Sequence, residues 1–189
     1  ILESVEPRFR SADGQWVGIT GRARVVTYNT DAVTPDELPE TLFGFVDPEW
    51  HGRVGFAPTN ASFQAHLTSI RVLEGDEAAR DFVQGLLDNG ARQYDGNSAA
   101  VAAVAAGEID VALVNHYYLY GWLAENPNAP VDNYYFPGDD IGNLINVAGA
   151  AIVSTTDSLP LAQQFIAYLL SNSAQRYFVE ETFEYPLLV

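Results

Sequence analysis

Residues 97–125 read NSAAVAAVAAGEIDVALVNHYYLYGWLAE, and this stretch decides the fold class. Its first part is rich in Ala and Val, can be capped by Asn97 or Ser98 and ends at Gly107, which predicts a helix. The apolar run DVALVN is typical of a strand buried on both faces of a sheet, and an aromatic segment follows it directly. Helix, strand and helix in this order indicate an α/β domain with a mostly parallel sheet flanked by helices.

The chain ahead of this stretch has the same alternation. We expect a short strand at residues 54–57, because an apolar run there is ended by Pro58. A helix through Leu73 should follow, with Thr59 or Asn60 as its N-cap. A strand, a polar turn and a helix start together form a geometry that binds anions.

Further elements are expected toward both ends of the sequence. Apolar and polar residues alternate at helical period over residues 76–89, and Gly90 is expected to end this helix. Residues 158–171 have the pattern of an amphipathic helix. Residues 14–29, GQWVGITGRARVVTYN, carry strand-forming side chains punctuated by glycine, which predicts a pair of strands. Residues 134–153 predict a loop followed by an apolar strand, and the sequence closes on the polar stretch EETFEYPLLV.

Composition limits the classes of function. With 48% apolar and 18% charged residues the chain has a globular composition, and its formal charge of -16 would repel phosphate backbones, so we expect no nucleic-acid binding. No apolar run has the length of a membrane span and no signal segment opens the sequence, so we expect no membrane insertion. The absence of cysteine excludes thiolate metal sites and thiol nucleophiles, which leaves oxygen and nitrogen ligands.

Polar and aromatic side chains lie where the buried strand gives way to the next helix. Asn115, Tyr117 and Tyr118 occupy this junction, and open α/β sheets bind ligands outside the carboxyl ends of their strands. Two adjacent tyrosines reach one ligand only where the backbone leaves strand alternation, and a strand-to-helix junction allows that. The alternative is an aromatic cluster with Tyr120 and Trp122 that packs one face of the domain.

Several strings together resemble the periplasmic ferric-ion-binding proteins of the type II periplasmic-binding-protein fold. In family order these strings are WVGITGRARVVTYN, DPEWHGRVGFAPTNASFQ, GNSAAV, GEIDVALVNHYY, VAGAAIV with AQQFIAYLLS, and EYPL. They cover nearly the whole chain, and NHYY and PTNASF are the most specific. The resemblance implies a two-lobed α/β protein of which one lobe is incomplete in this sequence. It implies residues 1–45 as a segment of the first lobe and hinge, 46–135 as the second lobe, and 136–189 as the return across the hinge with the C-terminal helix.

The resemblance also implies a metal site. Tyr117 and Tyr118 would supply phenolate oxygens to one Fe³⁺, together with a small anion such as phosphate or carbonate. Ferric iron favours anionic oxygen, and its charge can remove the proton from a phenol, whose pKa in water is about 10. The residues implied to hold the anion are Thr59, Asn60, Ala61, Ser62, Asn97 and Asn115. Backbone N–H groups and neutral amides suit this role, and simple helix capping by Thr59 and Asn97 is the alternative.

The three histidines are not expected to be metal ligands. His116 is expected beside the site rather than as a ligand, and His51 and His66 read as surface or packing residues. In members of that family, the segment that precedes the matching strings contributes a His and often a Glu to the iron. A same-fold protein for a polyamine, an oxyanion or an organic acid stays open as the alternative ligand class.

The implied function is that of an extracytoplasmic solute-binding protein that captures Fe³⁺ and delivers it to an ABC permease. We expect a monomer that is periplasmic or otherwise extracytoplasmic, with a lipid anchor as one form of attachment. An enzyme is not expected, because the sequence has no G-x-S-x-G string, no Cys/His pair and no H-E-x-x-H string.

Overall fold

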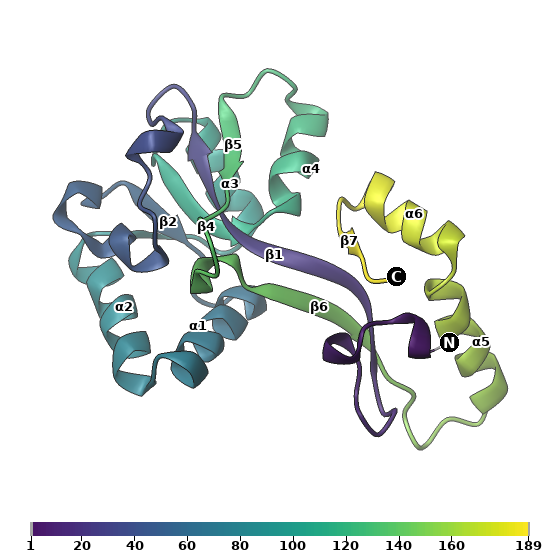
Figure 1. Cartoon of the computed structure of the whole chain (residues 1–189). Helices are drawn as coiled ribbons and strands as arrows, with labels where there is room; N and C mark the ends of the chain where they lie inside the picture. The colour runs from purple at the N-terminus through teal and green to yellow at the C-terminus, as the bar shows by residue number, and fades with distance from the viewer. Residues whose placement is uncertain (1, 189) are drawn as a thin grey trace. The chain divides into compact units, whose positions relative to one another are not determined.

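The computed structural model describes residues 2–188, and the chain divides into two compact units (Figure 1). Unit 1 comprises Ile1–Arg22 and Ile145–Val189, and unit 2 comprises Ala23–Leu144. Strand β1 (Val17–Asn29) begins in unit 1 and ends in unit 2, so one strand contributes to the sheet pairing of both units.

In unit 2 the strands lie in the order β3-β2-β4-β1-β5. Strand β2 is parallel to both β3 and β4, whereas β1 is antiparallel to β4 and β5. The strands other than β1 are β2 (Val54–Phe56), β3 (Arg92–Gln93), β4 (Val111–Asn115) and β5 (Val131–Tyr134). The helices are α1 (Ala61–Leu73), α2 (Asp76–Asp88), α3 (Asn97–Ala105) and α4 (Tyr117–Glu125).

The expected α/β fold with helices flanking a sheet is confirmed, and the parallel pairing is the part between β3, β2 and β4. These strands are joined by helices, as parallel pairs require. Strand β1 precedes this strand–helix alternation and is antiparallel to its neighbours in unit 2, so the complete sheet is mixed.

The two faces of this sheet are covered by different helices. In β4, Val111 and Leu113 pack in a cluster with apolar side chains of α1 and α2, while Ala112 and Val114 pack with side chains of α3 and α4 (Figure 1). Every residue of β4 is buried, which confirms the prediction of a strand buried on both faces.

Helix boundaries follow the predicted stop signals closely. Gly90 and Gly107 both adopt left-handed backbone conformations, with φ of 69° and 71°, directly after α2 and α3. Asn60 is the N-cap of α1, and its side chain accepts a hydrogen bond from the backbone N–H of Ser62. Short 3-10 helices lie at Leu2–Ser4, Pro7–Phe9, Pro35–Glu37, Leu42–Val46, Pro48–Trp50 and Ile141–Asn143.

The prediction of two strands within residues 14–29 is wrong, because β1 is one continuous strand. Gly18 and Gly21 do not mark a turn, and positive φ values are found at other glycines. A Cβ on Gly18 would lie 2.8 Å from both the carbonyl oxygen of Phe9 and a methyl group of Leu187. The glycine therefore permits close packing against distant segments, a requirement that local sequence does not reveal.

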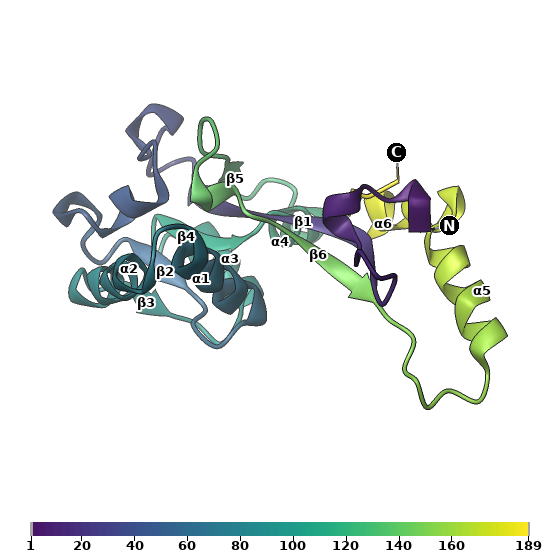
Figure 2. The ribbon, with the colours of Figure 1, turned by 60° about the horizontal axis from the view of Figure 1, so that its bottom comes forward.

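Unit 1 contains the remaining elements around a smaller apolar cluster. Strands β6 (Ile145–Ala150) and β7 (Tyr185–Pro186) pair with β1, and β6 leads through a loop into α5 (Leu159–Leu169) (Figure 2). Helix α6 (Asn172–Glu181) follows and is capped by Ser171, whose hydroxyl accepts from the N–H of Ala174. The sequence patterns predicted β6 and α5, but they did not predict α6, β5 or β7.

Candidate metal centre

The junction between β4 and α4 places two tyrosines side by side. The strand ends at Asn115, His116 already has helical dihedral angles (φ -55°, ψ -38°), and α4 begins at Tyr117. The rings of Tyr117 and Tyr118 stack with their centroids 4.4 Å apart and their planes 30° apart. Both rings are half-buried, so the two phenols form a partly accessible pair at the carboxyl end of the central strand.

The same rings take part in packing, as the aromatic-cluster alternative expected. Tyr118 and Trp122 pack against the apolar cluster of α3 and α4, and Tyr117 meets the ring of His116 edge-on at a centroid distance of 5.7 Å. Tyr120 is more exposed and also lies edge-on to His116, at 6.4 Å. Packing therefore fixes the ring positions and leaves part of each phenol of the pair accessible.

His116 is held by the backbone of β1. Its ring is buried, and its Nδ1 accepts a hydrogen bond from the backbone N–H of Ala23 at 3.1 Å. The carbonyl of His116 accepts from the side-chain amide of Asn133 in β5. These bonds tie the start of α4 to strands β1 and β5, which agrees with a supporting place for His116 beside the tyrosine pair.

The turn ahead of α1 is joined to the end of β4. Asn60 Oδ1 accepts from the N–H of Ser62 at 2.9 Å, and the hydroxyl of Ser62 accepts from Asn115 Nδ2 at 3.0 Å. Thr59 and Ala61 are exposed in the same turn, and Asn60, not Thr59, caps the helix. Four of the predicted anion residues and Asn115 thus lie together at the start of a 13-residue helix.

Asn97 does not cap helix α3, although the sequence offered that role for it. It is the first residue of α3 rather than its N-cap, a position that Gly96 takes. Its side chain is 1% exposed, and neither its oxygen nor its nitrogen has a hydrogen-bond partner among the described residues. An unsatisfied buried amide costs about 1–3 kcal/mol, so this residue carries unused hydrogen-bonding capacity beside the core.

A buried cation behind Asn115 was not predicted from the sequence. Arg24 of β1 is 1% exposed and donates to Asn115 Oδ1 at 3.0 Å, to the carbonyl of Leu113 at 2.7 Å and to His66 Nδ1 at 3.4 Å. Burial lowers the pKa of Arg24 to about 9, and negative charge on Tyr117 and Tyr118 opposes this decrease. The guanidinium therefore stays charged at neutral pH.

His66 is buried against this guanidinium. Burial, followed by the charge of Arg24, lowers the pKa of His66 to about 3, so its ring is neutral at physiological pH. With Nδ1 accepting from Arg24, Nε2 carries the proton and donates to the carbonyl of Ile141 at 2.9 Å. The expectation of a packing role holds for His66, which lies in the interior of unit 2, and His51 is exposed.

A metal site built from histidines and carboxylates is not found within residues 2–188. In this part of the chain, no three His, Asp or Glu side chains gather in a way that could hold a metal ion. The stacked phenols are therefore the candidate metal donors, and the amides near Asn115 are candidate donors to an anion. Of the helices described, none has both the length and the apolar character needed to cross a membrane.

Comparison with known families gives one match along nearly the whole chain. The family described as bacterial extracellular solute-binding protein matches residues 3–189. Iron uptake protein A1 of Synechocystis sp. is 37% identical over 197 residues, which cover 100% of this chain and 54% of that protein. The major ferric iron-binding protein of Neisseria meningitidis serogroup A is 35% identical over 179 residues, or 94% of this chain and 54% of that protein. The chain thus spans about half the length of these relatives.

Solved structures agree with the fold described above. Iron-bound HitA from Pseudomonas aeruginosa superposes with a TM-score of 0.94 at 37% identity, covering 99% of this chain and 61% of that one. A protein from Trichodesmium, solved in complex with iron and citrate ligands, gives a TM-score of 0.88 at 30% identity, with 99% and 61% coverage.

Proposed function

Because the chain belongs to the bacterial extracellular solute-binding protein family, we propose that it captures ferric iron outside the cytoplasm for delivery to an ABC permease. The observation that carries this proposal is the stacked pair Tyr117 and Tyr118 at the carboxyl end of β4. Relatives named for ferric iron binding or iron uptake support the choice of cargo.

The phenols would bind the cargo as phenolates. Fe³⁺ is small and highly charged, and it prefers anionic oxygen over the neutral nitrogen and thioether ligands available in proteins. Binding would displace one proton from each of Tyr117 and Tyr118, so iron affinity should fall as the pH falls. Because the two rings are already stacked, little ordering of these side chains would be needed on binding.

A small anion would complete the charge balance at this site. We propose that phosphate or carbonate binds at Thr59, Asn60, Ala61 and Ser62, with the amides of Asn97 and Asn115 as further donors. The helix N-terminus of α1 and the unpartnered amide of Asn97 support this assignment. The Trichodesmium relative, solved with iron and citrate, supports a small oxyanion as a companion of the metal.

The proposed function also implies a location, an oligomeric state and a role for each segment of the chain. We propose a periplasmic or otherwise extracytoplasmic monomer, attached in some cases through a lipid anchor, that binds rather than transforms its ligand. We also propose that residues 46–135 act as the lobe that carries the site, with residues 1–45 and 136–189 serving the hinge and the other lobe. The matched solute-binding family supports this transport role.

The direct test is a visible spectrum of the purified chain during titration with a ferric salt. Phenolate-to-iron charge transfer should produce a violet-red colour that saturates at one iron per chain. If no band develops, while a polyamine, an oxyanion or an organic acid binds alone, the ferric assignment fails and the alternative ligand class replaces it.

A further inference from the structure

The buried guanidinium of Arg24 lacks the counter-charge that a buried cation normally has. The ion pairs within residues 2–188 join Arg8 to Glu6, Arg53 to Asp110 and Arg71 to Asp76. Arg24 instead makes its three side-chain hydrogen bonds to neutral acceptors, namely an amide oxygen, a backbone carbonyl and an imidazole nitrogen. Because an uncompensated buried charge is costly, a buried arginine with only neutral partners favours the approach of a negatively charged ligand.

Arg24 also lies close to the two candidate metal ligands. As phenolates, Tyr117 and Tyr118 would favour the charged guanidinium, in opposition to burial, which lowers the pKa of Arg24. This coupling follows from the register of the sheet, because Arg24 of β1 lies directly across from Asn115 at the end of β4, two residues before the pair. The cation therefore belongs electrostatically to the same site as the phenols.

Arg24 also determines which way the amide of Asn115 points. Two guanidinium nitrogens hold the end of β4, one through the carbonyl of Leu113 and one through Asn115 Oδ1. With its oxygen engaged by Arg24, the amide of Asn115 must direct its nitrogen the other way, where it donates to the hydroxyl of Ser62. A continuous chain of hydrogen bonds thus runs from β1 through β4 to the turn ahead of α1.

The charges of iron, the two phenolates and Arg24 together indicate which anion the site would favour. One Fe³⁺ with two phenolates has a net charge of about +1, and the nearby guanidinium raises the local charge to about +2 in a partly buried environment. A dianion such as hydrogenphosphate or carbonate would neutralise this charge. Without the guanidinium, iron and the two phenolates would need less additional negative charge.

We propose that Arg24 is a positioning and specificity-determining residue that directs Asn115 toward residues 59–62, the anion turn, and makes iron capture depend on a small oxyanion. The inference rests on the proposed function, since it concerns the same site. It adds a residue outside the predicted ligand set and a reason why the site would require an anion.

The test measures how much inorganic phosphate increases iron affinity. Ferric affinity of the whole chain would be determined by competition with a chelator, in anion-poor buffer and with added phosphate, for the unaltered protein, Arg24→Gln, Arg24→Lys and Arg80→Gln. Arg80 is an exposed residue of α2, so its variant is the control with the same change in net charge as Arg24→Gln. Thermal unfolding of each variant would show that it remains folded.

We expect phosphate to raise the iron affinity of the unaltered chain and of Arg80→Gln equally. In Arg24→Gln the gain should shrink by about tenfold or more, while the phenolate-to-iron band persists. Arg24→Lys should keep an intermediate gain, because it retains the charge but loses the two-pronged contact with β4. If Arg24→Gln does not fold, Arg24→Lys alone is the test. An unchanged effect of phosphate on its iron affinity contradicts the inference, and an intermediate effect supports it.

Two further results would overturn the inference. One is that phosphate raises the iron affinity of both Arg24 variants as much as that of the unaltered chain. The other is that the variants lose iron affinity equally with and without phosphate, as a purely structural role would produce. Phosphate titration of the iron-free proteins separates this inference from the proposed function. If the unaltered chain binds no iron but binds phosphate more tightly than Arg24→Gln does, the iron proposal and the oxyanion dependence of iron capture fail, while the role of Arg24 in directing Asn115 toward the anion stands. If the unaltered chain binds neither, both proposals fail.

Discussion

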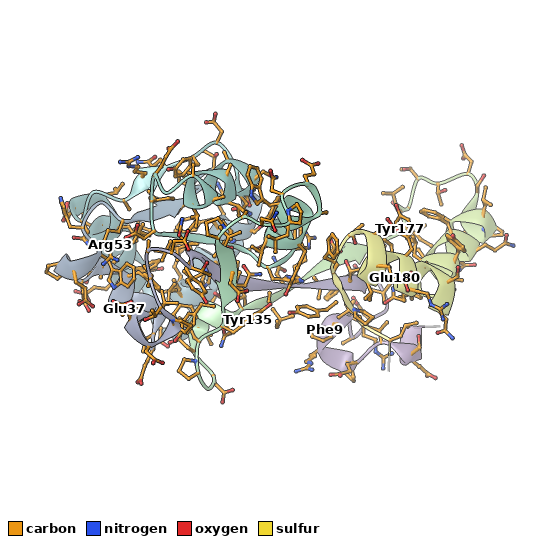
Figure 3. The ribbon with its side chains drawn as sticks, turned by 90° about the horizontal axis from the view of Figure 1, so that it is seen from above. Phe9, Glu37, Arg53, Tyr135, Tyr177 and Glu180 are labelled. Carbon is orange, nitrogen blue, oxygen red and sulfur yellow. The ribbon has the colours of Figure 1, made fainter. Side chains whose placement is uncertain are left out.

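The two units differ in how much of their apolar surface they bury. Unit 2 encloses large side chains such as Phe45 and Trp50 almost completely, in clusters on both faces of its sheet. In unit 1, α5 has no buried residue, and its Leu161, Phe165 and Tyr168 are each more than half exposed. Most of the large apolar side chains that are exposed in residues 2–188 belong to unit 1, and Tyr177 on α6 is another example (Figure 3).

The surface of unit 1 also contains a large apolar hollow. A cavity of about 730 Å³ is lined by residues that include Trp16, Val17, Ile152 and Ile166. Isolated exposed apolar residues are normal, but the number of them in unit 1, beside a cavity of this size, is high for a small compact unit. The buried core and the candidate site are therefore both concentrated in unit 2.

The largest effect is expected from removing a core ring of unit 2. Phe45→Ala should lower the free energy of unfolding by about 3–5 kcal/mol, because the ring is fully buried against Trp50 and Phe136. Its counterpart on α5, Phe165→Ala, should change stability by less than about 0.5 kcal/mol. Denaturant unfolding checks both variants, and equal losses would break the contrast between the units.

Acid should weaken unit 2 through His66. The pKa of this residue is lowered to about 3 in the folded protein, so the unfolded chain takes up a proton more readily, and stability is lost as the pH falls from about 6.5 toward 3. The contribution of His66 to this loss is at most about 5 kcal/mol.

His66→Gln should flatten the dependence of stability on pH in this window, whereas His51→Gln, at an exposed position, should leave it unchanged. Unfolding curves at several pH values provide the measurement. A slope that is the same in all three proteins would show that His66 does not titrate in this range on unfolding.

Within unit 1, packing should matter where β1 meets distant segments. Gly18→Val should cost about 1–3 kcal/mol, because a Cβ there would lie 2.8 Å from the carbonyl oxygen of Phe9. At Gly149 of β6 the nearest atom to an added Cβ is 3.6 Å away, so Gly149→Ala is the tolerated control. If Gly18→Val were as stable as the control, the close packing of β1 in unit 1 would be refuted.

The smallest stability effect is expected at the anion turn. Asn60→Ala should lower stability by about 1 kcal/mol through loss of the cap of α1, while Thr59→Ala should change it by much less. Thermal unfolding of the two variants distinguishes them. A larger loss in Thr59→Ala than in Asn60→Ala would contradict the assigned cap.

Local sequence signals account for most of unit 2. The alternation of strand and helix between residues 54 and 125, the stops at Gly90 and Gly107 and the place of the tyrosine pair all follow from periodicity and capping. Arg24 could not be predicted in this way, because its partners Asn115 and His66 are 91 and 42 residues away in the chain. An arginine within the apolar alternation of a strand was its only local signal.

The predictions that were wrong or missing in unit 1 also concern contacts between segments that are far apart in the sequence. Gly18 resembles a turn signal in the sequence, but its role depends on Phe9 and Leu187, which the fold brings to it from both ends of the chain. Helix α6 was not predicted, since Ser171, which is its cap, was expected to end the preceding helix, and the buried Gln175 donates to the distant carbonyl of Ile19. Contacts between distant segments, not local propensity, decide these elements.

The central claim is that the tyrosine pair of unit 2 binds ferric iron, and the double variant Tyr117→Phe with Tyr118→Phe tests it most directly. Both rings would keep their packing, so unfolding should shift by only about 1 kcal/mol for each lost hydroxyl. Iron affinity, measured by competition with a chelator, should be abolished together with the phenolate-to-iron band, whereas the control Tyr120→Phe should retain both. Wild-type affinity and colour in the double variant would show that Tyr117 and Tyr118 are packing residues and would contradict the account.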